Sequence, residues 1–151
     1  MPIWKKSDGQ TVRIGVLLFD QFSNHCLANA VEPLRAANDL SGEVLFEWEF
    51  LSLAGSSIIS SSGLEISTRG RLYQHSGDML FVIPSYEFRS HSDALSRVSL
   101  RMAAQRYTAL VGFDTGAWLM AAAELLEGCR ATIHWEELEA FAEEFPDVNV
   151  V

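Results

Sequence analysis

Gly112-Phe113-Asp114-Thr115-Gly116-Ala117 follows an apolar run and precedes a helical pattern, so it is predicted to form a tight turn from strand to helix. A side chain at such a turn is exposed at the carboxyl edge of a sheet, beside free backbone N–H groups. Enzymes that attack carbonyl groups place Ser or Cys at this position, because an alkoxide or thiolate is a strong nucleophile. Here the position holds Asp114, which favours a ligand-binding pocket over a nucleophilic enzyme.

The segments around this turn alternate between strand-like and helix-like patterns. Apolar runs rich in β-branched residues predict strands over 12–19, 44–53, 79–84, 108–113, 131–134 and 148–151, with a short hairpin over 58–59 and 64–66. Apolar residues at three- and four-residue spacing predict helices over 25–39, 94–105, 115–127 and 135–145. This order favours an α/β fold, a three-layer sandwich with a mostly parallel, flavodoxin-like sheet.

Helix-end signals support two of these helices. Ser23 or Asn24 is the predicted N-cap of helix 25–39, and Ser41-Gly42 is its predicted end. Gly128 stands where a left-handed C-cap would end helix 115–127.

Three loops are expected to converge beyond the carboxyl ends of the strands, where open parallel sheets bind their ligands. They are residues 20–25, 85–88 and 114–116. The candidate ligand-binding residues are Asp114, Thr115, Ser85, Tyr86, Asn24, His25, Trp118 and His134. An aromatic wall formed by Tyr86, Trp118 or Trp135 would add a cation–π attraction of about 0.5–2 kcal/mol for a quaternary ammonium.

Plainer interpretations of the same residues stay open. Asp114 would stabilise the following helix by about 1 kcal/mol if it acted only as an N-cap. His134 would bond to the backbone at a strand end. Cys26 and Cys129 are interpreted as small buried hydrophobes, because neither has a charged neighbour in sequence.

Length and charge exclude several classes of function. With 151 residues the chain is expected to form one domain that needs no disulfide, metal or cofactor to fold. Its 11 basic and 20 acidic residues give a net charge of -9, so this chain alone is not expected to bind nucleic acid. Lys5 and Lys6 are followed by polar residues instead of an apolar segment, and no apolar run could cross a bilayer. A cytoplasmic location without membrane contact is therefore expected.

Three stretches together resemble the class I glutamine amidotransferase-like (PfpI-like) domain at the N-terminus of many AraC/XylS-family transcription regulators. They are residues 32–38 (EPLRAAN), 112–123 (GFDTGAWLMAAA) and 130–136 (RATIHWE). In enzymes of this superfamily the elbow residue is a cysteine, helped by an acidic residue from the first helix region and often by a later histidine. Here the elbow holds Asp114, and residues 23–27 contain no Asp or Glu.

The resemblance implies that residues 1–151 form a single, non-catalytic sensor domain. The implied ligand is a cationic amine or amino acid such as arginine, carnitine or betaine, bound near Asp114. The resemblance also implies a homodimer that contacts DNA only through a helix-turn-helix domain absent from this chain. The superfamily domain normally continues beyond Val148 with a further strand and helix, so the chain is expected to be a C-terminally truncated piece of a longer regulator.

The same residues are compatible with two functions other than effector sensing. The Gly-Phe-Asp-Thr-Gly elbow also fits a hydrolase with Asp114 as an aspartyl nucleophile and His134 as base. The short chain, the lack of a second acid and the lack of a lid count against it. An ionised carboxylate beside a helix N-terminus is also a poorer nucleophile toward an amide than a thiolate. The other rival is a purely structural dimerisation module with a vestigial pocket.

Overall fold

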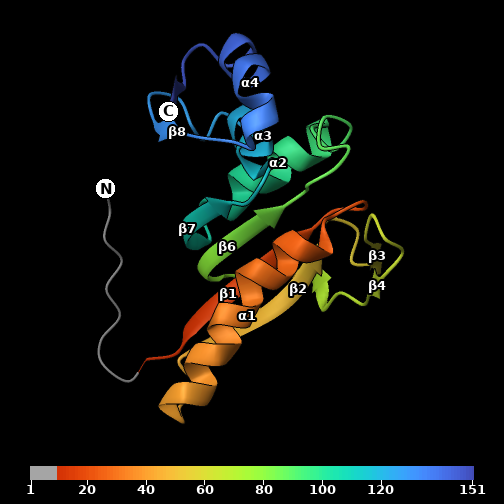
Figure 1. Cartoon of the computed structure of the whole chain (residues 1–151), viewed down its shortest axis with the longest axis vertical. Helices are drawn as coiled ribbons and strands as arrows, with labels where there is room; N and C mark the ends of the chain where they lie inside the picture. The colour runs from red at the N-terminus through yellow and green to blue at the C-terminus, as the bar shows by residue number, and fades with distance from the viewer. Residues whose placement is uncertain (1–9) are drawn as a thin grey trace.

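A computed structural model of the chain describes residues 10–151 (Figure 1). Its centre is a five-stranded parallel sheet in the order β5-β2-β1-β6-β7. The strands are β1 (Val12–Leu18), β2 (Phe46–Ser52), β5 (Gly70–Arg71), β6 (Gly77–Ile83) and β7 (Tyr107–Gly112). Two small pairs flank the sheet: antiparallel β3 (Ile58–Ile59) with β4 (Glu65–Ile66), and parallel β8 (Arg130–Ala131) with β9 (Asn149–Val150).

Helices cover both faces of this sheet. They are α1 (Asn24–Ser41), α2 (Ala94–Ala103), α3 (Gly116–Ala122) and α4 (Leu138–Glu144), with short 3-10 helices η1 (Leu72–Gln74) and η2 (Trp135–Glu137). Alternate residues of β1 point to opposite faces, so Val16 packs with Leu27 of α1, whereas Leu17 packs with Leu100 of α2 and Leu119 of α3. The three layers confirm the predicted α/β sandwich.

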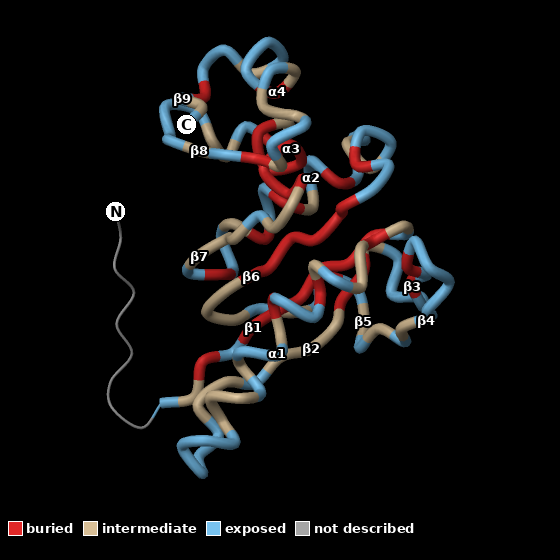
Figure 2. Tube along the Cα trace, viewed as in Figure 1, coloured by how far each residue is buried: buried red, intermediate tan, exposed pale blue. Residues whose placement is uncertain are grey.

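The core runs along the two central strands, which Figure 2 shows as buried over most of their length. Val16 and Leu17 of β1 and Val82 and Ile83 of β6 are all 0% exposed. Each such aliphatic side chain contributes about 1.5–3 kcal/mol to folding by leaving water. The most buried part of the sheet therefore carries the loops that follow β1 and β6.

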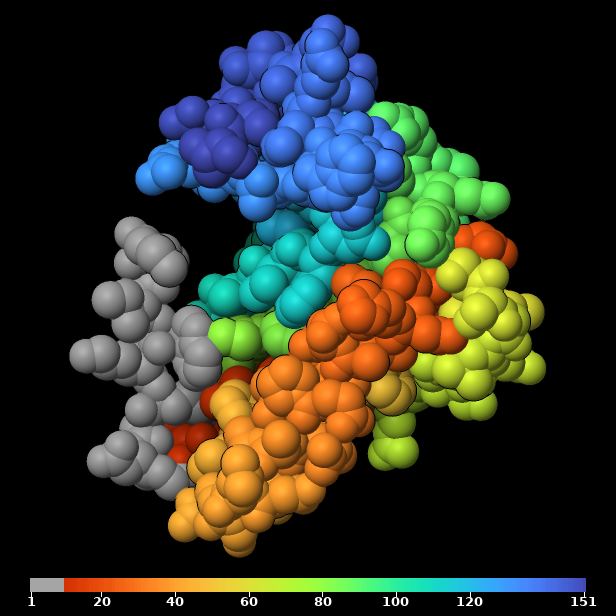
Figure 3. Space-filling view, viewed as in Figure 1, coloured from red at the N-terminus to blue at the C-terminus, as the bar shows by residue number. Residues whose placement is uncertain are grey.

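A third apolar cluster attaches the C-terminal part of the chain. Phe141 of α4 is fully buried and packs with Phe88, Trp118 and Val148. In the space-filling view this C-terminal part, in blue, forms one end of the molecule, and α1, in orange, crosses the other (Figure 3). The segment from β8 to β9 is thereby held over α3, next to the elbow.

The ends of α1 are those that the sequence indicates. Ser23 is the N-cap, and its hydroxyl accepts a hydrogen bond from the Cys26 N–H at 3.3 Å. Gly42 ends the helix with φ 70°, in the left-handed region that glycine tolerates best. Both end signals were predicted correctly.

The prediction for α3 was wrong at its C-terminal end, because the helix stops at Ala122 instead of residue 127. Glu124 turns the chain with φ 62°, a left-handed conformation that a non-glycine residue rarely adopts. Gly128 is left-handed too, with φ 69°, but its N–H donates to the Asp147 carbonyl at 2.8 Å. Gly128 therefore belongs to a later turn and does not cap α3.

Smaller differences concern short elements. The predicted strand 131–134 is only the two-residue β8, the predicted helix 135–145 starts as a 3-10 turn, and β5 and η1 were not predicted. The expectation drawn from Lys5 and Lys6 lies outside the described residues. Within residues 10–151, no helix combines the length and the apolar character needed to span a bilayer.

Candidate functional site

The elbow between β7 and α3 has the predicted strained turn. Asp114 adopts φ 56°, which costs a non-glycine residue about 1–2 kcal/mol. The Gly116 N–H closes the turn by donating to the Phe113 carbonyl at 2.7 Å. A Cβ atom on Gly116 would lie 2.4 Å from the Val82 carbonyl oxygen, so only glycine fits where the turn crosses β6. Packing thus fixes the backbone of Asp114.

The Asp114 side chain takes no part in capping α3. The N-cap of that helix is Thr115, which makes no side-chain cap. Instead, the Thr115 hydroxyl donates to the Ser85 carbonyl at 2.6 Å in a buried hydrogen bond. Among residues 10–151, no hydrogen bond or ion pair to the Asp114 carboxylate is formed. The structure therefore gives no support to the capping interpretation of Asp114.

Asp114 lines a pocket of about 570 Å³ between the loop after β6 and η2. Five of the eight predicted residues surround it: Asp114, Thr115, Ser85, Tyr86 and His134. Three further acidic residues, Glu87, Glu136 and Glu137, also line it, together with Arg89, which borders a neighbouring groove as well. Two of the three predicted loops therefore meet at one pocket.

Ser85 forms part of this pocket as a buried polar residue. It is 3% exposed and adopts φ 54°, a second strained position facing the elbow. Its hydroxyl oxygen makes no hydrogen bond of normal geometry with any described group. A buried hydroxyl without a partner is unfavourable by about 1–3 kcal/mol. The thiol of Cys26 is the polar side-chain group that interacts with this hydroxyl.

Cys26 of α1 belongs to the same neighbourhood, and the sequence interpretation missed it. Burial is the main cause that raises the pKa of its thiol to about 11; the Asp114 carboxylate adds to the increase and Ser85 opposes it. The thiol is therefore neutral at physiological pH. One signal in the sequence could have pointed to Cys26. It lies within residues 23–27, where the superfamily resemblance implies an acidic residue of the site.

Trp118 does not line the Asp114 pocket, contrary to prediction. Its ring packs against Phe88 at 5.3 Å and Phe145 at 5.1 Å between centroids, on the side of α3 that faces α4. The guanidinium carbon of Arg89 lies 4.6 Å from the same ring. Arg89 therefore makes the cation–π contact with Trp118 that was predicted for a ligand. Trp135 is also outside the pocket lining and is 72% exposed.

Asn24 and His25 are not brought to the pocket either. The Asn24 amide nitrogen donates to the Ser62 hydroxyl at 2.5 Å, toward the β3–β4 hairpin, and His25 is exposed. The loop 20–25 meets the loop after β6 at other points. The Tyr86 N–H donates to the Gln21 carbonyl at 3.4 Å, and the His91 ring lies 2.8 Å from the Asp20 carbonyl. The loop 20–25 therefore contacts the segment after β6 but does not line the pocket.

His134 reaches the elbow mainly through its backbone. Its N–H donates to the Asp114 carbonyl at 3.1 Å, which ties the segment after β8 to the elbow. Its ring nitrogen Nδ1 accepts from the Glu136 N–H at 3.4 Å. The predicted structural interpretation of His134 agrees with these contacts, and its ring also lines the pocket.

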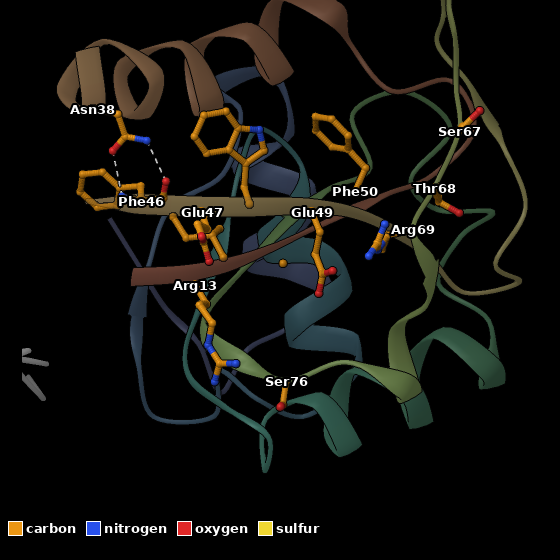
Figure 4. Close-up of a pocket in the computed structure, with 13 residues that line it drawn as sticks. Arg13, Asn38, Phe46, Glu47, Glu49, Phe50, Ser67, Thr68, Arg69 and Ser76 are labelled. Carbon is orange, nitrogen blue, oxygen red and sulfur yellow. Dashed lines mark hydrogen bonds between the residues drawn. The ribbon is translucent and has the colours of Figure 1, made fainter. Parts of the chain in front are cut away.

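A larger groove of about 860 Å³ runs along the edge of β2 (Figure 4). Phe50 lies on one side of the strand, and Glu49 and Arg13 lie on the other. The Asn38 amide bonds to both the N–H and the carbonyl of Phe46 and so blocks part of the strand edge. Because these side chains diverge across one strand, the groove lacks the convergence of the smaller elbow pocket.

No family model matches the chain, but its sequence is similar to part of several transcription regulators. It is 39% identical over 136 residues to the HTH-type transcriptional regulator CdhR of Pseudomonas aeruginosa, covering 89% of this chain and 40% of that protein. GbdR of the same species is 38% identical over 136 residues (89% and 37%), and ArgR is 33% identical over 142 residues (92% and 42%). The chain spans about 40% of the length of these relatives.

Solved structures agree with the sequence comparison. An AraC family transcriptional regulator from Pseudomonas putida superimposes with a TM-score of 0.72 at 25% identity, covering 93% of this chain and 76% of that one. A ThiJ/PfpI family protein from Pseudomonas syringae superimposes with a TM-score of 0.75 at 18% identity (93% and 57%), which shows the shared fold. The chain is therefore similar to part of HTH-type transcriptional regulators and of an AraC family regulator, and it shares the fold of ThiJ/PfpI family proteins.

Proposed function

We propose that this chain is a non-catalytic effector-sensing domain that binds a small cationic metabolite in the elbow pocket, with Asp114 as its anionic anchor. The observation that carries the proposal is the state of Asp114: its backbone is strained at φ 56°, and its carboxylate lines a pocket without a partner among the described residues. Strain of this kind persists only where the surrounding structure enforces it, and it is concentrated at functional sites.

The charge of the pocket supports a cation as ligand. Four of the lining residues are acidic, namely Asp114, Glu87, Glu136 and Glu137, whereas Arg89 is the one lysine or arginine among them. A cleft lined with an excess of one charge attracts ligands of the opposite charge. The family resemblance adds arginine, carnitine and betaine as the first candidates to test.

The chemistry of the site supports binding without catalysis. An amidase would need a thiolate at the elbow, but the elbow holds a carboxylate, and the thiol of Cys26 is neutral because its pKa is raised to about 11. An aspartyl hydrolase would instead form an ester on Asp114. Incubation with alkyl halides or esters followed by mass spectrometry separates the two, since sensing predicts no adduct on Asp114.

In this proposal the sensed signal reaches DNA through a domain outside this chain, within a homodimer of the whole regulator. The effector must then bind one of two conformational states more tightly than the other, because a ligand with equal affinity for both states does not change their populations. Regulators named among the relatives support this division of labour.

Calorimetric titration with L-arginine, L-carnitine and glycine betaine tests the proposal. At least one of them should bind the wild-type chain, and Asp114→Asn should weaken that binding by roughly 10- to 100-fold, since a hydrogen bond to a charged group contributes about 1.5–3 kcal/mol. Asp147→Asn is the matched control, because Asp147 is an exposed residue of a neighbouring groove. Equal affinity in wild type and Asp114→Asn would refute the anchor role.

A further inference from the structure

We infer that the groove between α2 and α4 is the two-fold interface on which a second copy of this chain docks, with α2 of each copy against α4 of the other. This inference rests on the homodimer of the proposed function and adds the surface that forms it. The groove measures about 780 Å³, and α3 lines it between α2 and α4. Figure 1 shows these three helices grouped at the end of the molecule away from α1.

The two sides of this groove carry opposite charge. The segment 89–106 contains α2 and has one acidic residue, Asp93, but four arginines: Arg89, Arg97, Arg101 and Arg106. The segment 136–147 contains α4 and has six acidic residues without a lysine or arginine. Because the whole chain has a net charge of -9, two copies repel each other over most of their surfaces. A basic surface beside an acidic one is where a second copy is attracted instead.

Within one chain these charges do not neutralise each other across the groove. Arg97 lines it on the α2 side, and Glu143 and Glu144 line it on the α4 side. Among residues 10–151, none of these three side chains forms a hydrogen bond or an ion pair. In a two-fold dimer the same patch of both copies meets, so that each contact between two different residues occurs twice. Arg97 of one copy can then pair with an acidic residue of α4 in the other.

An apolar stripe on α2 continues from the rim of the groove. Leu95, Val98 and Met102 recur at three- and four-residue spacing, and each is between 47% and 60% exposed. Arg97 directly precedes Val98, so the charged rim and the stripe belong to one surface. An exposed apolar patch rimmed by charged residues is typical of a protein–protein contact, which needs an apolar centre and a polar rim.

The combination of both charges on one face favours a second copy over a different protein. An acidic partner would be attracted by α2 but repelled by α4, and a basic partner would meet the reverse, since like charges across an interface are unfavourable. A copy related by a two-fold axis presents an acidic side to α2 and a basic side to α4 at the same time. The face is therefore complementary to itself.

Sedimentation velocity over a range of protein concentrations tests this inference with Arg97→Glu and Glu143→Arg. The wild-type chain should form dimers. Each variant alone should raise the dissociation constant of the dimer by roughly 10-fold or more, because each reversed charge acts twice in a symmetric dimer. An equimolar mixture of the two variants should form heterodimers about as tightly as wild type, because both pairs of opposite charge are then restored between the chains.

Two comparisons separate this interface from less specific effects. The two reversals change the net charge in opposite directions, so an effect of net charge alone would strengthen the dimer of Glu143→Arg. Val98→Asn should weaken the wild-type dimer, whereas Val44→Asn, at an exposed valine before β2, should not. Circular dichroism verifies the fold of each variant.

Three results would overturn the inference. A wild-type chain that stays monomeric at every concentration would exclude this interface. A dimer that neither charge reversal weakens would use another surface, although the homodimer of the proposed function would survive. Two weakened variants whose mixture forms no heterodimer would show that the charges act within one chain. Neither Arg97 nor Glu143 lines the elbow pocket, so calorimetric titration of the same variants tests effector binding separately.

Discussion

The Asp114 side chain is free for a ligand because other residues hold the elbow in shape. Gly116 passes under the Val82 carbonyl, and Thr115 binds the Ser85 carbonyl through its hydroxyl. Neither contact involves the carboxylate. The side chain at the turn can therefore differ in its chemistry without loss of the contacts that hold the backbone.

Gly116→Ala should destabilise the chain by about 1–3 kcal/mol, because its new Cβ would lie 2.4 Å from the carbonyl oxygen of a central strand. Gly42→Ala is the control, since no atom lies within 4 Å of a Cβ there and only the left-handed φ of 70° opposes the change. Urea unfolding measures both. The steric account is wrong if Gly116→Ala lowers the free energy of unfolding by less than Gly42→Ala does.

Thr115→Val should lower the free energy of unfolding by about 1–3 kcal/mol, because it leaves the buried Ser85 carbonyl without its 2.6 Å hydrogen bond. Thr115→Ser keeps the hydroxyl and should recover most of the loss. Urea denaturation compares the two variants with wild type. Equal stability of the Val and Ser variants would show that this hydrogen bond does not hold the elbow to the loop after β6.

Among the helices, α1 was predictable at both ends, whereas α3 was not. The signals of α1 are local: Ser23 bonds to an N–H three residues ahead, and Gly42 accepts the left-handed turn that follows. The end of α3 depends on Glu124 in a left-handed conformation and on a contact between Gly128 and Asp147 that closes across the fold. Neither follows from residue preference.

Ser23→Ala should destabilise α1 and the chain by about 1 kcal/mol, since its hydroxyl is the side-chain cap of a helix with no acidic residue in its first turn. Ser23→Asp keeps a capping oxygen and should preserve stability. Chemical denaturation followed by circular dichroism measures the difference. A Ser23→Ala variant as stable as wild type would contradict the capping role.

Across the fold, the loops of the site were predictable but the faces of its helices were not. Parallel strands place residues 85–88 and 114–116 at one edge by topology, and both line the pocket. Trp118 lies on a helix that is buried nearly all round, so its sequence pattern does not decide which side faces the ligand. Cys26 reaches Asp114 only through the packing of α1 on the sheet.

Alkaline pH should destabilise the folded chain. Burial raises the pKa of Cys26 from 9.0 to about 11 and that of Tyr107 from 10.0 to about 12. Because both pKa values are higher in the folded state, their contribution is complete below pH 9 and is lost as pH rises toward 12. Urea unfolding from pH 8 to 12 should show this fall. In the double variant Cys26→Ala/Tyr107→Phe, the free energy of unfolding should change less with pH. The control Tyr73→Phe replaces an exposed tyrosine and should keep the wild-type pH dependence.

The most direct test follows the Asp114 carboxyl carbon by NMR in a ¹³C-aspartate-labelled chain, with Asp114→Asn assigning its resonance. We expect that resonance to shift saturably on addition of L-arginine or glycine betaine, with a midpoint equal to the calorimetric Kd, while the Asp147 resonance stays in place. Saturable heat of binding with an unmoved Asp114 resonance would contradict the account, because the ligand would then be bound elsewhere.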